Sequence, residues 1–283
     1  MGELDQPRAF VVGYPIGHSR SPLIHRHWLD QAGLAGSYHP LAVAPAELRA
    51  FVAALKDGSS GFVGGNVTIP HKEAMLELVD EIDDTARQIG AVNTLWLDNG
   101  RLMAGNTDSH GFAANLDESA PGWTSGKTAV ILGAGGASRS VIHALLSRGF
   151  QSIRLANRTL ERARALSDQF GDRISAHGID QLQKLLKGAD LFVNTTSMGM
   201  GGSAVPDIDF TIMAETALVT DIVYTPLETP ILALARRQGL TTVDGLGMLL
   251  HQAVPGFARW FGQTPRVTPE LRQLIIGAME KGS

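Results

Sequence analysis

Cysteine is absent from all 283 residues of the sequence. Its absence excludes disulfides, thiolate nucleophiles and cysteine-ligated zinc or iron–sulfur centres, and it fits a reducing compartment. No run of about 18 apolar residues occurs, so no membrane span is expected. The acidic, polar stretch Met1–Arg8 does not resemble a signal peptide. We therefore expect a cytoplasmic protein.

A strong charge imbalance is missing as well. The 24 Lys and Arg residues against 28 Asp and Glu residues give a net charge of −4. Such a chain has no general attraction to nucleic acid or to an acidic membrane surface, which leaves a small molecule as the expected partner. The nine histidines lack neighbouring carboxylates at ligand spacing, so no metal site is predicted. The sequence does not decide between a monomer and a homodimer.

Short β-rich runs alternate with helical patterns, which predicts an α/β protein with mostly parallel sheets covered by helices. The length suggests about two domains. In the first part we predict strands in 9–13, 38–43 and 61–67, a hairpin turning at Asn99–Gly100, helices in 22–33 and 45–58, and a further helix beginning at Pro70. The pattern restarts near residue 127, with strands in 127–132, 152–159, 190–196 and 217–224 and helices in 139–148, 160–170, 246–261 and 269–279.

A glycine-rich turn follows the strand predicted at 127–132. It has the form G-x-G-x-x-S and opens a helix within a βαβ unit, which is the context of a dinucleotide-binding Rossmann domain. Glycines there permit a tight turn and a close approach of the backbone to a pyrophosphate at the positive helix end. The motif consists of Gly133, Ala134, Gly135, Gly136, Ala137 and Ser138. The alternative is a glycine turn that only packs.

The end of the next strand indicates which dinucleotide binds. An NAD site has an acidic residue there for the ribose 2′-hydroxyl, whereas this strand ends in Asn157 and Arg158. Thr159 is in position to cap the next helix, which puts Arg162 at its third residue. Two arginines beside a positive helix end favour an anion such as the 2′-phosphate of NADP, although they could also be solvated surface residues.

Polar clusters in the first part indicate where the chemistry occurs. Lys72 follows Pro70 in the predicted helix start, where the helix dipole disfavours a cation. Ser19 and Ser21 follow the first strand, Asn93 lies in a strand, and Asp108 lies where a strand gives way to a helix. Strand ends of this kind converge at one edge of a doubly wound sheet. The plainer alternatives are that Lys72 is an exposed surface residue and that Ser21 caps the helix near Pro22.

Nine short motifs, in this order along nearly the whole chain, together resemble the shikimate dehydrogenase family: HSRSP, NVTIPHK, GAVNTL, NTD, GAGGAS, NRT, NTTSMG, DIVYTPLETP and DGLGMLLHQA. The resemblance implies an oxidoreductase that reversibly reduces 3-dehydroshikimate to shikimate with NADPH, in the shikimate pathway of aromatic amino acid biosynthesis. It also implies a substrate domain, 1–112 with 246–283, and an NADP-binding Rossmann domain, 113–245.

The resemblance also implies roles for single residues. Lys72 and Asp108 would be the catalytic pair. The substrate would be held by Ser19, Ser21, Thr68, Asn93, Tyr224 and Gln252. Besides the glycine turn and the residues of the second strand end, the cofactor would contact Thr195, Thr196, Ser197, Met198, Ile222, Gly245 and Met248. This sequence departs from the family pattern at Ala104–Gly105, at Ser109 and at His71.

Ketone reduction needs a hydride and a proton. NADPH supplies the hydride, and we expect Lys72 to supply the proton with the assistance of Asp108. An unperturbed lysine has a pKa of roughly 10.4, which the predicted helix start and a desolvated cleft would lower. Three alternatives remain: a quinate or shikimate dehydrogenase that uses NAD, a non-catalytic NADPH-binding sensor on the same fold, and a dehydrogenase of a modified shikimate-like ring.

Overall fold

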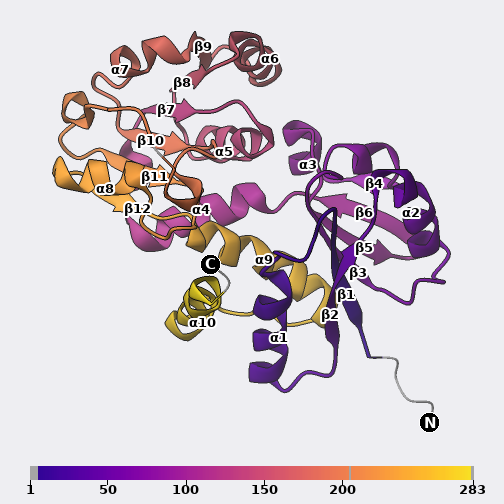
Figure 1. The fold of residues 1–283 in the computed structure, drawn as a ribbon. Coiled ribbons are helices and arrows are strands. Elements are labelled where there is room, and N and C mark those ends of the chain that lie inside the picture. The colour runs from indigo at the N-terminus through magenta and orange to yellow at the C-terminus, as the bar shows by residue number, and fades with distance from the viewer. Residues whose placement is uncertain (1–5, 204, 282–283) are drawn as a thin grey trace. The chain divides into compact units, whose positions relative to one another are not determined.

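The computed structural model describes residues 6–203 and 205–281, which fall into two compact units (Figure 1). The first unit runs to Thr107 and resumes at Gln252, and the second unit comprises Asp108–His251. Helix α9 (Leu246–Phe261) therefore begins in the second unit and ends in the first. The sequence placed the two domain crossings after residue 112 and before residue 246, and the assignment of substrate and cofactor to the two units stays a prediction.

The first unit is built on a six-stranded mixed sheet with the order β2-β1-β3-β5-β6-β4. Three neighbouring pairs are parallel, β1 with β2, β1 with β3 and β4 with β6, and the two pairs made by β5 are antiparallel. The strands are β1 (Arg8–Gly13), β2 (Ser37–Ala42), β3 (Gly64–Val67), β4 (Glu81–Ile82), β5 (Thr94–Asp98) and β6 (Arg101–Gly105). The α-helices are α1 (Ser21–Ala32), α2 (Leu48–Lys56), α3 (Asp84–Ile89) and α10 (Pro269–Glu280), with 3-10 turns η1 (Pro45–Glu47) and η2 (Ala74–Glu77).

The predicted hairpin is confirmed. β5 and β6 turn at Asn99 and Gly100, whose φ values of 49° and 77° are the positive values that a two-residue hairpin turn requires. One face of the sheet packs on an apolar core that includes Phe10, Val12 and Leu95. Helices α1 and α10 lie side by side in Figure 1.

The predicted helix at Pro70 is wrong. The chain makes a turn at 69–73, and only the four-residue 3-10 helix η2 follows, so Lys72 precedes any helical residue. The reason is the short path back to the sheet: the N–H groups of Asp80 and Asp83 already bond to the carbonyls of Leu102 and Ala104 on β6. A helix dipole therefore does not act on Lys72, contrary to the expectation from the sequence.

The second unit contains a six-stranded, entirely parallel sheet with the order β12-β11-β10-β7-β8-β9. The strands are β7 (Thr128–Leu132), β8 (Ser152–Asn157), β9 (Ile174–Gly178), β10 (Leu191–Asn194), β11 (Leu218–Asp221) and β12 (Thr241–Val243). The α-helices are α4 (Asp108–Ser119), α5 (Gly136–Ser147), α6 (Leu160–Phe170), α7 (Leu182–Leu185) and α8 (Pro230–Arg237), with 3-10 turns η3 (Trp123–Ser125), η4 (Ile179–Gln181), η5 (Met200–Gly202) and η6 (Phe210–Ile212).

Side chains of the central strand β7 alternate between two cores. Ala129 and Ile131 pack with the core that α4, α5 and α6 cover, while Val130 and Leu132 pack with the core that α8 covers. A parallel sheet buried on both faces is the expected doubly wound arrangement. Helix α6 has the predicted bounds, and α5 begins at Gly136 instead of Arg139 because the glycine turn itself forms the first helical residues.

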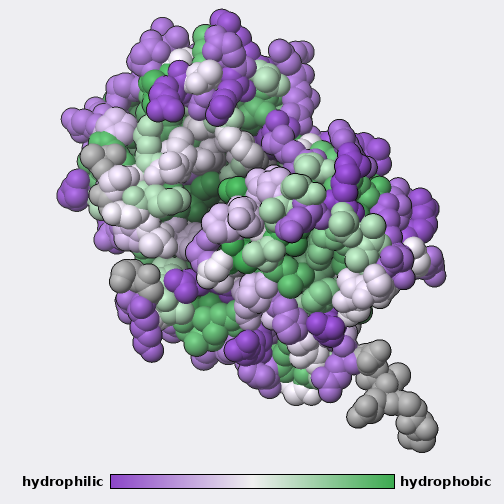
Figure 2. Space-filling view, turned by 45° about the vertical axis from the view of Figure 1, so that its right-hand side comes forward, coloured by the Kyte–Doolittle hydropathy of each residue, from purple (hydrophilic) through white to green (hydrophobic). Residues whose placement is uncertain are grey.

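Hydrophilic residues predominate along the outline of the face shown in Figure 2, with hydrophobic residues between them. Among residues 6–203 and 205–281, none of the helices combines the length and the apolar character that a membrane span requires.

Candidate functional site

The glycine turn lies between β7 and α5, at the carboxyl end of the central strand. Gly133 has a φ of 110°, and a Cβ there would lie 2.6 Å from Thr195 Oγ1, so both the backbone and the packing require glycine. At Gly135 and Gly136 a Cβ would meet no described atom within 4 Å. The start of α5 is therefore open toward a ligand, which fits a pyrophosphate bound at the positive helix end.

Ser138 occupies the position of the third glycine of the motif, and its side chain makes hydrogen bonds inside the turn. Its Oγ donates to the Gly133 carbonyl at 2.8 Å and accepts from the Gly135 N–H at 3.0 Å. It also lies 2.7 Å from Thr195 Oγ1. Ser138 is fully buried, so it stabilises the turn from behind. Together with Thr195, it fixes the shape of the turn before any ligand binds.

The end of β8 is joined to the glycine turn by Asn157. Its Oδ1 accepts the Ala134 N–H at 3.1 Å, and its Nδ2 donates to the Thr159 carbonyl at 2.8 Å. A carboxylate is absent from this strand end, as the sequence predicted. Thr159 is the residue before α6, but its side chain makes no capping hydrogen bond within the described chain.

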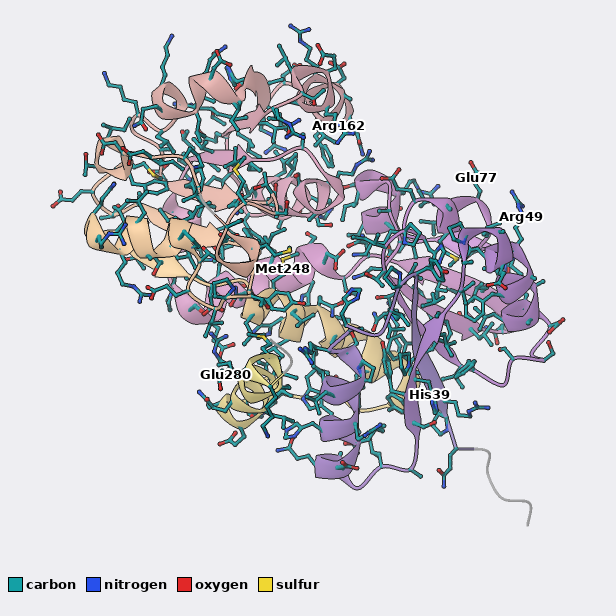
Figure 3. The ribbon with its side chains drawn as sticks, viewed as in Figure 1. His39, Arg49, Glu77, Arg162, Met248 and Glu280 are labelled. Carbon is teal, nitrogen blue, oxygen red and sulfur yellow. The ribbon has the colours of Figure 1, made fainter. Side chains whose placement is uncertain are left out.

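Arg158 and Arg162 are exposed beside the start of α6, where Figure 3 marks Arg162. In the described part of the chain, neither guanidinium has a hydrogen-bond or ion-pair partner. Two such cations next to a positive helix end repel each other and the helix, which an anionic ligand would relieve. These two arginines therefore fit the 2′-phosphate that NADP carries on its ribose.

The loop from Asn194 to Gly199 is held by a buried polar group that the sequence reasoning missed. Asn194 Nδ2 donates to Asp221 Oδ1 at 2.9 Å and to the Met198 carbonyl at 3.1 Å, while its Oδ1 accepts the Thr196 hydroxyl at 2.7 Å. Asp221 also accepts from the Thr229 hydroxyl at 2.7 Å. Burial raises the pKa of Asp221 to about 6. Hydrogen bonds of the buried Asn194 therefore hold the loop on its inner side, while Ser197 is exposed.

The remaining predicted cofactor residues gather in the same unit. Ala134, Ile222 and Met248 are partly buried and pack on one core. Gly245 is close to this group, because a Cβ there would lie 2.5 Å from the Ile222 carbonyl carbon. Figure 3 marks Met248 near the start of α9. Turn, loop and helix start thus converge within one unit.

In the first unit, the loop that carries the two serines adjoins the segment that precedes Lys72. The Tyr14 N–H donates to the Ile69 carbonyl at 3.0 Å, and Ser19 Oγ accepts the Ser21 N–H at 3.3 Å. Thr68 follows β3, and its N–H donates to the Val12 carbonyl of β1. Ser21 begins α1 and makes no side-chain cap, so the alternative reading of Ser21 as a cap is wrong.

A backbone hydrogen bond joins Lys72 to the residue that precedes Asn93. The Lys72 carbonyl accepts the Val92 N–H at 2.8 Å, one residue before Asn93. The preceding residue His71 is buried, with Nε2 2.7 Å from the Val43 carbonyl, so it anchors the turn. Lys72 itself is half-buried. The backbone of Lys72 is therefore anchored and the residue is not fully exposed, so the alternative of a freely exposed surface lysine is wrong.

A chain of buried hydrogen bonds fixes the side-chain amide of Asn93. The Tyr38 hydroxyl donates to Asn66 Oδ1 at 2.7 Å, and Asn66 Nδ2 donates to the Asn93 carbonyl at 3.1 Å. Asn93 Oδ1 accepts the Thr94 hydroxyl at 2.8 Å and the Thr107 N–H at 2.8 Å. Because Oδ1 receives these donors, the other amide atom is Nδ2, which lies 3.0 Å from Thr107 Oγ1.

This amide chain, Tyr38–Asn66–Thr94–Asn93–Thr107, continues to α9. Thr107 Oγ1 donates to the Gln252 carbonyl at 2.8 Å, and Asn93 Nδ2 lies 3.5 Å from Gln252 Oε1. Asn93 and Gln252 were predicted from the sequence as site residues, whereas Tyr38, Asn66, Thr94 and Thr107 were not. Their polar side chains within apolar runs were the available signal, since buried polar groups need partners.

Asp108 and Tyr224 belong to the second unit, whereas Lys72, the two serines, Thr68, Asn93 and Gln252 belong to the first. Asp108 is the first residue of α4, and Tyr224 lies half-buried after β11. The described residues contain no cluster of three His, Asp or Glu side chains that could hold a metal ion.

The doubly wound sheet, the open glycine turn and the acid-free strand end define a dinucleotide-binding protein of the Rossmann class. Residues 11–95 match the shikimate dehydrogenase substrate binding domain, residues 116–200 match shikimate/quinate 5-dehydrogenase, and residues 245–269 match the shikimate 5′-dehydrogenase C-terminal domain. The chain belongs to the shikimate dehydrogenase family.

Similar proteins cover nearly the whole chain. Shikimate dehydrogenase (NADP(+)) of Rhizobium etli is 58% identical over 97% of this chain and 96% of its own length. The shikimate 5-dehydrogenase of Thermus thermophilus, solved in complex with NADP(H) and shikimate, has a TM-score of 0.83 and 34% identity over 96% of this chain and 99% of that one. The quinate dehydrogenase of Corynebacterium glutamicum, solved in complex with NAD, has a TM-score of 0.87 and 32% identity over 96% and 99%.

Proposed function

We propose that the chain is an NADP-dependent shikimate dehydrogenase that reversibly reduces 3-dehydroshikimate to shikimate, a step of aromatic amino acid biosynthesis. The observation that carries the cofactor choice is the end of β8. An NAD site would place a carboxylate there, whereas this chain has Arg158 beside that strand end and Arg162 in the first turn of α6, neither with an ion-pair partner among the described residues. The names of relatives such as the Rhizobium etli protein support the substrate.

NADPH supplies a hydride to the substrate carbonyl carbon when it is bound. The open start of α5 would hold its pyrophosphate, and Arg158 with Arg162 its 2′-phosphate. Gly245, Met248 and the loop Asn194–Gly199 would shape the site for the nicotinamide. The hydrogen bonds of Asp221 to Asn194 and Thr229 would hold that loop in shape before the nicotinamide binds.

The protein's own part in the reaction is the proton transfer. Lys72 would donate a proton to the carbonyl oxygen as the alkoxide develops and would take it back in the reverse direction, with Asp108 orienting the ammonium. The substrate carboxylate and hydroxyls would be held by Ser19, Ser21, Thr68, Asn93, Tyr224 and Gln252, with Ser19 and Ser21 as neutral donors suited to the carboxylate.

A crossed assay on the purified protein tests the proposal. Initial rates are followed by nicotinamide absorbance, with shikimate and quinate each paired with NADP⁺ and NAD⁺. We expect the largest kcat/KM for shikimate with NADP⁺. A larger value with NAD⁺ or quinate would support the NAD-dependent alternative, and NADPH binding without turnover of any pair would support the sensor.

The setting of the enzyme is also a proposal. A cytoplasmic location fits the use of NADPH and the lack of cysteine. Monomer and homodimer remain open, and light scattering of the purified protein distinguishes them.

A further inference from the structure

Helix α4 carries a buried hydrogen bond next to the proposed catalytic carboxylate. Ser109, the second residue of α4, has its Oγ 2.8 Å from Nδ1 of His143 on α5. Ser109 is 6% exposed, so its hydroxyl depends on this partner for a hydrogen bond that water would otherwise provide. The bond joins the turn that holds Asp108 to the helix that opens at the glycine turn. Both residues lie in the second unit.

The far end of α4 is tied to the segment expected near the nicotinamide. Asn115 Nδ2 donates to the Asp244 carbonyl at 2.8 Å, one residue before Gly245. The Gly247 backbone packs directly on Asn115, because a Cβ there would come within 1.8 Å of Asn115 Oδ1. The body of α4 is thus fixed relative to the cofactor-binding segments.

The first turn of α4 is different, because the N–H groups of a helix start lack intrahelical partners and such turns fray. The Ser109–His143 bond joins that turn to α5, which α4 also contacts through the apolar core that the two helices share. A glycine or alanine at residue 109 would remove this side-chain tie between α5 and the turn that holds Asp108.

We propose that Ser109 and His143 are positioning residues: their hydrogen bond holds Asp108 at a fixed position relative to α5, the helix of the same unit that begins at the glycine turn. The proposal rests on the proposed function, because it assumes that Asp108 acts in the reaction. It concerns the rate of the chemical step and not the binding of either substrate. Loss of the bond would displace the carboxylate without removing any group that contacts NADP or shikimate.

The test is a double-mutant cycle measured on the full chain. The variants are Ser109→Ala, His143→Leu and the two combined, with His143→Asn as the conservative replacement, since an asparagine amide can place a polar atom near the position of Nδ1. Glu118→Gln is the matched control, because it breaks the exposed Glu118–His251 pair on the same helix. kcat and both KM values are measured well below the melting temperature of each variant.

We expect Ser109→Ala and His143→Leu each to lower kcat roughly three- to tenfold, with both KM values nearly unchanged. The combined variant should be no slower than either single one, His143→Asn should recover most of the rate, and Glu118→Gln should match the parent protein. Losses that multiply, a His143→Asn as slow as His143→Leu, or a lower melting temperature with unchanged kcat would overturn the proposal.

Asp108→Asn separates this failure from that of the proposed function. If the parent protein oxidises shikimate and Asp108→Asn abolishes that activity while the Ser109 series has no effect, only the positioning role fails. If the parent protein does not turn over shikimate at all, the proposed function itself fails.

Discussion

The two units bind their proposed ligands by different physical means. In the second unit the candidate site is made of backbone and exposed charge: the open start of α5 and the guanidiniums of Arg158 and Arg162. In the first unit it consists, apart from Lys72, of neutral side chains, and protein hydrogen bonds orient at least one of them: the Thr94 hydroxyl and the Thr107 N–H both donate to Asn93 Oδ1. In the proposed function, the first kind of site would recognise phosphate by charge, and the second would distinguish hydroxyl groups by the direction of their hydrogen bonds.

This difference has a consequence for substitutions. A site that depends on exposed charge loses affinity in proportion to the charge removed and to salt. A site that depends on a chain of hydrogen bonds is sensitive to residues that never contact the ligand. The following predictions test this contrast, starting with the largest expected effect.

Removal of the Lys72 amine should have the largest effect. Lys72→Ala should lower kcat at least about a hundredfold, because general acid–base catalysis contributes about 10² to 10⁴ in rate. KM for shikimate should change much less. Steady-state rates of shikimate oxidation measure both constants.

Lys56→Ala is the matched control, since Lys56 belongs to the same unit and pairs with Asp80 at 2.6 Å. It should leave kcat unchanged. A Lys72→Ala variant in which only KM rises would make Lys72 a binding residue and would require another acid.

The combined change Arg158→Ala and Arg162→Ala should raise KM for NADP⁺ by about 10- to 100-fold, because hydrogen bonds to charged groups contribute about 1.5–3 kcal/mol. KM for NAD⁺ should hardly change, since NAD⁺ has no 2′-phosphate. Arg164→Ala, another exposed arginine of α6, is the control. Equal effects on both cofactors would contradict a 2′-phosphate site.

Tyr38→Phe tests the amide chain. The change leaves buried Asn66 Oδ1 without its donor, so we expect unfolding to become easier by about 1–3 kcal/mol and kcat/KM for shikimate to fall roughly three- to tenfold. The Kd for NADP⁺, measured by calorimetry, should be unaffected. Tyr14→Phe, at a tyrosine that is 52% exposed, is the control. A change in NADP⁺ affinity in place of shikimate kinetics would argue against the chain.

The smallest effect on activity, but a clear one on stability, is expected at His25. This ring is buried against Tyr38, with centroids 3.9 Å apart, and burial lowers its pKa from 6.5 to about 3. The nearby Asn66 amide opposes the shift without reaching hydrogen-bond geometry with the ring. The unfolded chain binds the His25 proton more tightly than the folded chain does. The free energy of unfolding is therefore unaffected by His25 above pH 6.5 and decreases as the pH falls from 6.5 toward 3.

The loss should be about 1.4 kcal/mol per pH unit below 6.5, or about 2 kcal/mol at pH 5. Urea titrations at pH 8 and pH 5 measure it. His25→Phe keeps an aromatic ring at the site and removes the titration, so its stability should change less between the two pH values. An identical pH dependence in both proteins would exclude His25 as the cause.

The sequence predicted the second unit better than the first, for a physical reason. The glycine turn, the acid-free end of β8 and the bounds of α6 depend on local sequence, and the structure confirms them. The segment after Pro70 was misjudged because its conformation depends on bonds between Asp80, Asp83 and the distant strand β6. Tyr38, Asn66 and Thr107 were missed for the same reason, since their hydrogen bonds exist only once β2, β3, β5 and β6 have come together in one sheet.

The most direct test of the central claim is hydride transfer itself. The protein is incubated with 3-dehydroshikimate and NADPH deuterated at both C4 positions, and the product is analysed by mass spectrometry, with Lys72→Ala in parallel. The account predicts shikimate that carries one deuterium on the reduced carbon, formed far more slowly by the variant. Unlabelled product, or no product beside tightly bound NADPH, would contradict it.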